Sequence, residues 1–142
     1  MRTRVLFVCS RNAGRSQMAE GIARTLLPHC EIFSAGERPS VISPVAISVM
    51  AERGIDISSQ YSKGTGDLPP GDFDVLVILG LWENPDRLPR ARRVIREILP
   101  DPRDLSGSTG GVKEGFRMLR DLLWEKIRAW EEEGVFRVEG KG

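Results

Sequence analysis

The apolar and polar positions near the start of the chain predict a strand, a loop and a helix, in that order. Residues 5–8 form an unbroken run of apolar residues that favour β structure, as in a parallel strand buried on both faces. After a polar stretch with small residues, Met18, Ile22 and Leu26 recur at helical spacing until Pro28. The polar stretch, residues 9–15, therefore connects the end of a strand to the start of a helix.

The same alternation continues through the middle of the chain. Residues 31–34 predict a second strand, and Ser43 followed by Pro44 predicts the capped start of a second helix. Residues 55–71 contain several glycines and prolines, so we expect a surface connection there, before a third buried strand at residues 75–79. Strands that alternate with helices are typical of an α/β layered fold with a parallel sheet.

The last third of the chain contains one ambiguous segment and one clear helix. The apolar positions of residues 90–99 fit either a helix face or a strand, and periodicity alone does not decide between them. From Gly111 to Gly134, apolar residues recur at helical spacing and predict a long terminal helix packed on the sheet. We expect all of these apolar side chains to lie in the core: Val112, Phe116, Leu119, Leu122, Leu123, Ile127 and Trp130.

Composition adds few constraints beyond a soluble domain. The 142 residues are 40% apolar, which is enough for one core, and we expect residues 1–142 to form a single domain without repeats or linkers. The 21 basic and 20 acidic residues give a net charge of +1, so we expect no nucleic-acid or membrane partner. Apolar runs are far shorter than the roughly 20 residues that span a bilayer, and no leader pattern is present. These features predict a cytoplasmic protein.

Cysteine and histidine usage argues against a metal site. The chain has two cysteines, Cys9 and Cys30, without metal-type spacing, and one histidine, His29. Zinc sites draw several ligands from cysteine, histidine and carboxylates, so zinc chemistry is excluded and we expect no cofactor. His29 lies in a turn signal between Pro28 and Cys30 and is expected at the surface rather than in a nucleophile pair.

The candidate chemistry lies in the loop after the first strand. Cys9 is followed six residues later by Arg15 and then by Ser16. The Cys-x5-Arg spacing alone is a weak signal. Here, however, it lies at the carboxyl end of a buried strand and at a helix N-terminus, where ligands of such folds bind. Backbone N–H groups of a short loop and the helix dipole bind an anion there, and the same field favours the thiolate of Cys9.

Each neighbour of Cys9 then has an expected role. Arg15 would act as a bidentate clamp on two oxygens of the anion, and Ser16 would donate to the Cys9 sulfur or cap the helix, two roles that are compatible. Asn12 tolerates the left-handed conformation of a tight loop, and Gly14 allows close approach of the main chain to a ligand. The whole predicted oxyanion-binding loop consists of Ser10, Arg11, Asn12, Ala13, Gly14 and Ser16 around the nucleophile.

Asp101 is the candidate proton donor. It precedes Pro102 after the apolar segment of residues 90–99, so an aspartate there would reach the mouth of the loop as general acid and then as base toward water. Taken alone, Asp-Pro is also an ordinary turn signal.

The chain resembles the low-molecular-weight protein tyrosine phosphatase superfamily, and more narrowly its arsenate reductase branch. The resemblance starts with residues 5–20, VLFVCSRNAGRSQMAE, and continues nearly to the end of the chain. Further matching segments are Ser34-Ala35-Gly36, Gly54-Ile55-Asp56-Ile57-Ser58, Ser62-Lys63, Asp72-Phe73-Asp74, Asp101-Pro102, Phe116-Arg117 and Arg120-Asp121. It implies a four-stranded parallel sheet flanked by helices on both faces, with residues 90–99 contributing the last strand. It also implies Cys9 as nucleophile and Asp101 as general acid.

Two departures from the family pattern limit what the resemblance implies. Thioredoxin-linked reductases of this branch use cysteines just after the third strand, where this chain has Gly80 and Trp82. The other cysteine, Cys30, lies too far from Cys9 to form a disulfide easily, since the first helix separates it from the loop by ~18 Å at about 1.5 Å per residue. An internal disulfide relay is therefore not expected. The phosphotyrosine branch commonly carries tyrosine after Asp-Pro, whereas Arg103 and Asp104 follow here, so an aromatic wall would have to come from elsewhere, such as Trp82.

Three functions fit these residues. The leading interpretation is a metal-free phosphatase of the protein tyrosine phosphatase type that hydrolyses phosphomonoesters through a cysteinyl-phosphate on Cys9. The alternative is an arsenate reductase that uses an external thiol on the same loop. The third is a non-catalytic anion-binding module. The expected partners are phosphate, arsenate or a phosphorylated substrate, with an external thiol as reductant in the second case.

Overall fold

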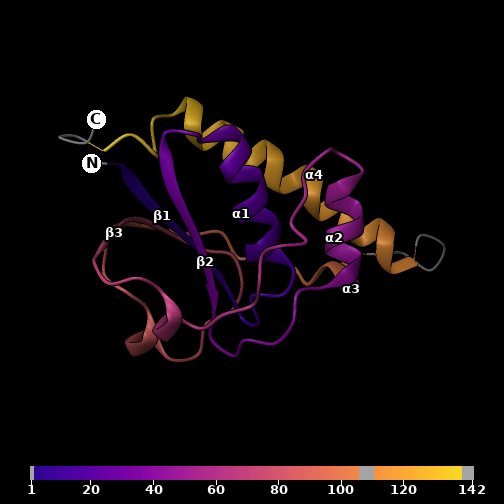
Figure 1. The fold of residues 1–142 in the computed structure, drawn as a ribbon, viewed down its shortest axis with the longest axis horizontal. Coiled ribbons are helices and arrows are strands. Elements are labelled where there is room, and N and C mark those ends of the chain that lie inside the picture. Colours follow the sequence, from indigo (N-terminus) through magenta and orange to yellow (C-terminus); the bar gives the residue numbers. More distant parts are fainter. Residues whose placement is uncertain (1, 106–110, 139–142) are drawn as a thin grey trace.

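The computed structural model describes residues 2–105 and 111–138 and is built around a four-stranded parallel sheet (Figure 1). The strands lie in the order β2-β1-β3-β4, and all three neighbouring pairs are parallel. The expected α/β fold is confirmed, and the segment that sequence left ambiguous forms the edge strand β4. The bounds of the strands are β1 Thr3–Cys9, β2 Cys30–Gly36, β3 Phe73–Ile78 and β4 Ala91–Arg96.

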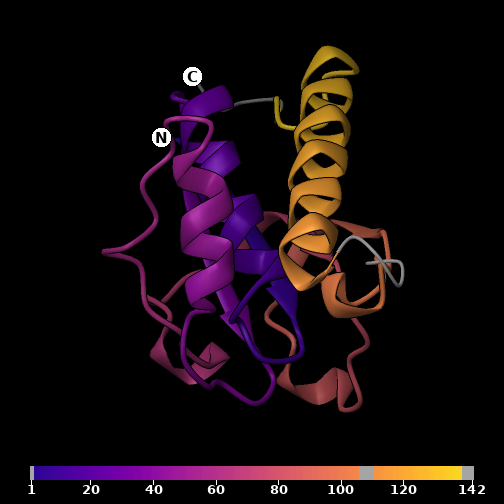
Figure 2. The ribbon, with the colours of Figure 1, turned by 90° about the vertical axis from the view of Figure 1, so that its right-hand side faces the viewer.

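The α-helices pack on one face of this sheet. α1 contacts β1 and β2, and α4 and α2 pack beside α1, so the three helices run alongside each other (Figure 2). The core between the sheet and these helices is apolar, with Val5 and Phe7 from the sheet and Met18, Ile22 and Leu119 from the helices all fully buried. The helix bounds are α1 Arg15–Leu26, α2 Pro44–Ala51, α3 Pro102–Leu105 and α4 Gly111–Glu132.

The second face of the sheet carries a smaller core under two chain crossings. Leu6 and Val8 of β1 pack there against Leu68, Trp82 and Leu88. The crossings contain the 3₁₀ helices η1 (Thr65–Asp67) and η2 (Pro85–Arg87). Helices flank both faces as expected, but on this face they are single turns, because the glycines and prolines of these crossings do not support a longer α-helix.

A capping residue marks the start of α2, and position around the helix decides which side chains of α4 are buried. Ser43 accepts a hydrogen bond from the Ala46 backbone N–H at 3.3 Å, so the predicted cap before Pro44 is confirmed. Of the seven apolar residues of α4 expected in the core, two are exposed, Val112 and Leu122, so the expectation is wrong for them. Leu122 lies about 100° around the helix from the buried stripe, and Val112 lies ahead of the first α4 side chain that reaches the core.

Candidate active site

The loop between β1 and α1 turns its carbonyl groups outward. Six consecutive carbonyl oxygens accept hydrogen bonds from surrounding segments or from the first turns of α1. The pairs are Cys9 O with Glu37 N, Ser10 O with Arg38 N, Arg11 O with Ser62 Oγ, Asn12 O with Gln17 Nε2, Ala13 O with Ser43 N and Gly14 O with Met18 N. The outer side of the loop is thus tied to three other parts of the chain.

An outward carbonyl implies an inward amide. A trans peptide unit is planar, so its N–H points away from its C=O, and the described chain contains no cis peptide bond. The N–H groups that follow these carbonyls, from Ser10 to Arg15, therefore face the centre of the loop. Asn12 makes the curve possible, because it has the only positive φ of a described non-glycine residue, 51°. The expectation of a left-handed asparagine is confirmed.

A buried amide network holds Asn12 in place. The Asn12 side-chain oxygen accepts from Gln17 Nε2 at 2.8 Å and from the Lys63 backbone N–H at 3.0 Å, and its amide nitrogen donates to Ser16 Oγ at 2.7 Å. Gln60 in turn donates to the Gln17 side-chain oxygen at 2.7 Å. Asn12, Ser16 and Gln17 have no exposed surface. Because every group in this network has a partner, the loop is held in one shape before any ligand arrives.

Cys9 and Ser16 are in direct contact at the base of the loop. The Cys9 Sγ lies 3.0 Å from Ser16 Oγ, and Cys9 is only 2% exposed. Ser16 Oγ already accepts from Asn12, so its own proton is available to donate to the sulfur. α1 has Gly14 as its N-cap residue and no side-chain cap. Of the two roles expected for Ser16, the structure therefore shows the contact with sulfur and not the helix cap.

Arg15 lies beside Cys9 and is held by the segment after β4. Its Nη1 donates to the Leu99 carbonyl oxygen at 2.9 Å. A Cβ on Gly80 would lie 3.1 Å from Arg15 Nη1 and 3.3 Å from the Cys9 Cβ. The guanidinium thus fits across the end of β3 only because residue 80 has no side chain.

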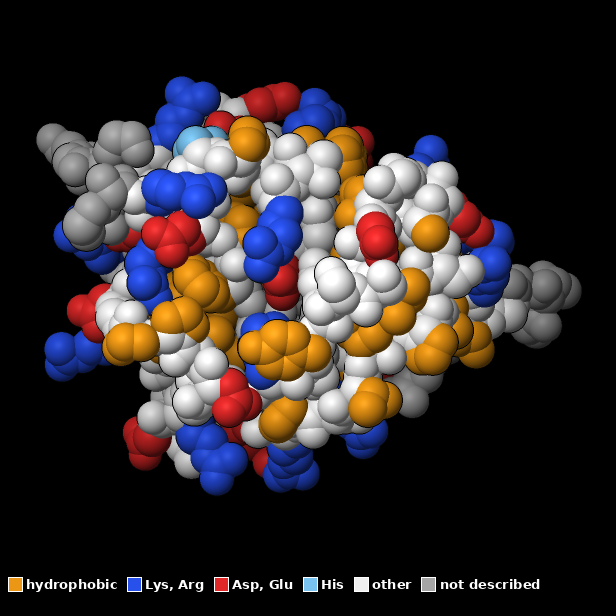
Figure 3. All heavy atoms as spheres, in the orientation of Figure 1, with side chains coloured by type: hydrophobic (Ala, Val, Ile, Leu, Met, Phe, Trp, Pro, Cys, Tyr) orange, Lys and Arg blue, Asp and Glu red, His pale blue; other side chains and the backbone are white. Residues whose placement is uncertain are grey.

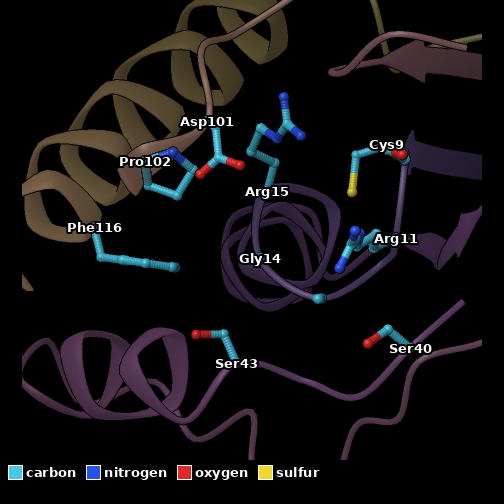
Figure 4. A pocket seen from close by; sticks show the side chains of 11 residues that line it. Cys9, Arg11, Gly14, Arg15, Ser40, Ser43, Asp101, Pro102 and Phe116 are labelled. Atoms are coloured by element: carbon cyan, nitrogen blue, oxygen red, sulfur yellow. The ribbon is translucent and has the colours of Figure 1, made fainter. Parts of the chain in front are cut away.

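Cys9, Arg15 and most residues of the loop line one cavity of about 250 Å³. Asp101 and Pro102 line it on the side of Phe116, and the sulfur of Cys9 points toward the loop from the opposite side (Figure 4). The lining residues are Cys9, Ser10, Arg11, Ala13, Gly14, Arg15, Ser40, Ser43, Asp101, Pro102 and Phe116. Of the predicted site residues, only Asn12 and Ser16 lie outside the lining, in the buried layer beneath it.

Sequence reasoning missed several residues that shape this site. Gly36 at the end of β2 touches the loop so closely that a Cβ there would lie 2.6 Å from the Asn12 backbone nitrogen. Gln17 and Glu20 are buried polar residues on α1: Gln17 donates to Asn12 of the loop, whereas Glu20 accepts from Ser34 of β2. Trp82 is not an aromatic wall of the cavity, because it packs on the second face of the sheet and its Nε1 donates to the Asn84 carbonyl.

Cys30 lies at the other end of the strands. It pairs with Thr3 at the start of β1, whereas Cys9 pairs with Gly36. Burial, together with the nearby charge of Glu131, raises the pKa of the Cys30 thiol to about 11. Cys30 is therefore a protonated, 3% exposed core residue and does not contact the cavity.

Other kinds of site find little support in the described chain. Within residues 2–105 and 111–138, no cluster of three or more histidine, cysteine or acidic side chains is placed to hold a metal ion. The helices of the same residues include none with the length and apolar character of a membrane span. Acidic and basic side chains are interspersed on the face seen in Figure 3, in keeping with the net charge of +1.

Comparisons with known proteins agree with this geometry. The chain is 40% identical over 126 residues to the glutaredoxin arsenate reductase of Synechocystis, covering 87% of this chain and 92% of that protein. The structure of an arsenate reductase in the phosphate-binding state superposes with a TM-score of 0.76 at 34% identity, over 92% of this chain and 98% of the other.

More distant structures share the fold. The Vibrio vulnificus protein Wzb in complex with benzylphosphonate has a TM-score of 0.72 at 22% identity, over 94% of this chain and 99% of that one. The family model described as low molecular weight phosphotyrosine protein phosphatase matches residues 4–135. The resemblance first noted in the residues around Cys9 is confirmed: this chain is an enzyme that belongs to the low molecular weight phosphotyrosine protein phosphatase family.

Proposed function

We propose that this enzyme is an arsenate reductase that takes its electrons from an external thiol. The observation that carries the proposal is the combination of a preformed anion loop around Cys9 with the absence of any second thiol near it in a chain that has two cysteines. The named relatives at 34–40% identity are arsenate reductases, whereas the Vibrio vulnificus protein Wzb lies at 22% identity and supports the fold alone. The order of the two functions favoured by sequence is therefore reversed.

The first step is a nucleophilic substitution at arsenic. Inward N–H groups of the loop and Arg15 hold the arsenate oxygens above the Cys9 sulfur, which lies 3.0 Å from the Ser16 hydroxyl oxygen. Sulfur attacks arsenic, and the opposite oxygen leaves as water after Asp101 delivers a proton. The product is a Cys9 thioarsenate, and no electron has yet been transferred.

The second and third steps use two molecules of thiol. The first thiol attacks the arsenic in line with the Cys9 sulfur, so a new sulfur–arsenic bond forms and Cys9 leaves as a thiolate. A second thiol attacks the sulfur of this adduct, and the electron pair of the sulfur–arsenic bond stays on arsenic. Arsenate is thereby reduced to arsenite, and the two thiols are oxidised to one disulfide.

A phosphatase is the second candidate, because Asp101 could serve it in the same role as proton donor. Asp101 lines the cavity opposite the Cys9 side, where the leaving oxygen of a phosphomonoester would be protonated. Attack of water on a Cys9 phosphate has the same in-line geometry as attack of a thiol on the thioarsenate. The two reactions therefore share one site and differ in the second nucleophile.

One experiment separates the two functions. Purified protein is incubated with arsenate and dithiothreitol, and arsenite is measured, while release of p-nitrophenol from its phosphate ester is measured in parallel. We expect thiol-dependent arsenite formation with a kcat/KM at least about tenfold above that of ester hydrolysis. Ester hydrolysis without arsenite formation would assign the phosphatase function instead.

A further inference from the structure

The mouth of the cavity carries a cation that the loop does not use for its own structure. The Arg11 side chain is exposed and lines the cavity, and among the described residues its guanidinium makes no hydrogen bond or ion pair. Figure 4 shows it on the same side of the cavity as the Cys9 sulfur and Ser40, across from Asp101 and Phe116. Arg15, in contrast, is held by the Leu99 carbonyl.

The loop N–H groups and Arg15 can bind an anion at the base of the cavity without Arg11. The inward N–H groups between Ser10 and Arg15 and the start of α1 already face that position, and Arg15 lies beside it. A charged guanidinium at the rim is then placed to bind a second anionic group above the first. A cavity of about 250 Å³ has room for a small molecule beside the anion.

The positions of Cys30 and Arg15 limit where the attacking thiol can come from. Cys30 is six positions along the paired strands from Cys9, about 20 Å at roughly 3.3 Å per residue, so the thiol comes from outside the chain. The side of Cys9 that faces Gly80 is closed by the Arg15 guanidinium. A thiol that approaches along the exposed side of the cavity passes Arg11 and meets the arsenic on the side away from the Cys9 sulfur.

We propose that Arg11 binds the carboxylate of a low-molecular-weight thiol and so selects a small anionic thiol as the electron donor. This inference rests on the proposed arsenate reductase function. Arg11 acts on the step in which the thiol attacks the Cys9 thioarsenate, forming a sulfur–arsenic bond to the thiol while the bond to Cys9 breaks. A second molecule of the same thiol then forms the disulfide and releases arsenite.

The test compares a carboxylated thiol with thiols that lack a carboxylate. Arsenite formation is measured with glutathione, with glutathione diethyl ester and with 2-mercaptoethanol, for the unaltered protein and for Arg11→Ala and Arg11→Lys. In Arg11→Ala we expect the KM for glutathione to rise about tenfold relative to the KM for either thiol without a carboxylate. Arg11→Lys should recover part of this difference, and Arg53→Ala, which removes an exposed arginine beyond the far end of α2, should leave the ratio unchanged.

The outcomes separate this inference from the proposed function. Equal rises in KM for thiols with and without a carboxylate, a change confined to the KM for arsenate, or activity only with a protein dithiol such as thioredoxin would each overturn the role of Arg11. Any of these results leaves arsenate reduction intact. Absence of arsenite with every thiol, dithiothreitol included, would instead refute the proposed function and this inference with it.

Discussion

The two cysteines of this chain are buried to nearly the same extent and lie at opposite ends of neighbouring strands. Cys9 is 2% exposed and Cys30 is 3% exposed. Cys9 lies at the carboxyl end of β1, beneath a loop of inward N–H groups and next to the Ser16 hydroxyl. Cys30 lies at the start of β2 and has the Phe136 carbonyl oxygen 3.9 Å from its sulfur, with Glu131 nearby.

The comparison shows that burial alone does not decide the chemistry of a thiol. Around Cys30, desolvation and negative charge both oppose the thiolate, which raises its pKa to about 11. Around Cys9, the neighbouring groups are N–H and O–H donors that stabilise an anion. The two buried thiols therefore differ in the direction of the dipoles around them, and this difference supports the proposed role of Cys9 as nucleophile.

The largest expected effect is that of removing the sulfur of Cys9. We expect Cys9→Ser to lower kcat for arsenate reduction and for ester hydrolysis by at least ~10³-fold, because both begin with attack by this sulfur. Binding of phosphate, measured by calorimetry, should persist, since the loop amides and Arg15 remain. Cys30→Ser is the matched control and should retain turnover, and comparable losses in the two variants would contradict the contrast between the two sites.

Alkylation compares the two thiols within one molecule. At pH 8 only about 10⁻³ of a thiol with a pKa near 11 is ionised, so we expect iodoacetamide to label Cys9 at least ~100-fold faster than Cys30. Mass spectrometry of peptides taken at successive times gives both rates. Phosphate should protect Cys9 and leave the rate at Cys30 unchanged. Similar rates at the two positions would show that their surroundings do not differ in the way described.

Much of the fold follows from local patterns in the sequence. The strand at residues 5–8, the capped helix after Ser43 and the long terminal helix all have a clear period and clear end signals. Residues 90–99 remained ambiguous because an edge strand with exposed side chains does not carry the unbroken apolar run of a buried strand. The same limit applies to Leu122, whose place on the helix surface depends on which face meets the sheet.

The site was predictable where one loop contains the chemistry and not where distant segments meet. Cys9, Asn12 and Arg15 are adjacent in sequence, and their spacing at a strand end was enough to predict an anion loop. Gly36 and Gly80 matter because other strands end beside this loop, a fact that depends on the strand order. A glycine without a neighbouring motif gives no sequence signal of such a contact.

The contact between Gly36 and the loop can be tested by adding one methyl group. A Cβ at residue 36 would lie within 3 Å of three atoms of Arg11 and Asn12, two of them backbone atoms, so Gly36→Ala must shift the loop. We expect a loss of about 1–3 kcal/mol in unfolding free energy and about a tenfold lower kcat/KM. Gly66→Ala, where a Cβ meets nothing within 4 Å, is the control. Unchanged activity in Gly36→Ala would mean that the loop does not depend on its distance from β2.

The smallest expected effect concerns a carboxylate in the helical layer, away from both cysteines. Hydrogen bonds from Arg117 and then Arg120 lower the pKa of Glu52 from 4.5 to about 2, although partial desolvation acts in the other direction. The folded pKa is below the unfolded one, so the stability from this group is present above pH 4.5 and is lost as the pH falls toward 2.

In Glu52→Gln we expect a lower urea midpoint at pH 7 and a smaller difference from the unaltered protein at pH 3. Glu125→Gln, which removes an exposed partner of Arg128, is the control. Because Glu52 joins the end of α2 to α4 and touches no residue of the loop, kcat at pH 7 should not change. A change in kcat would mean that the helical layer helps to set the geometry around Cys9, and the contrast between the two thiols would then depend on more than their immediate neighbours.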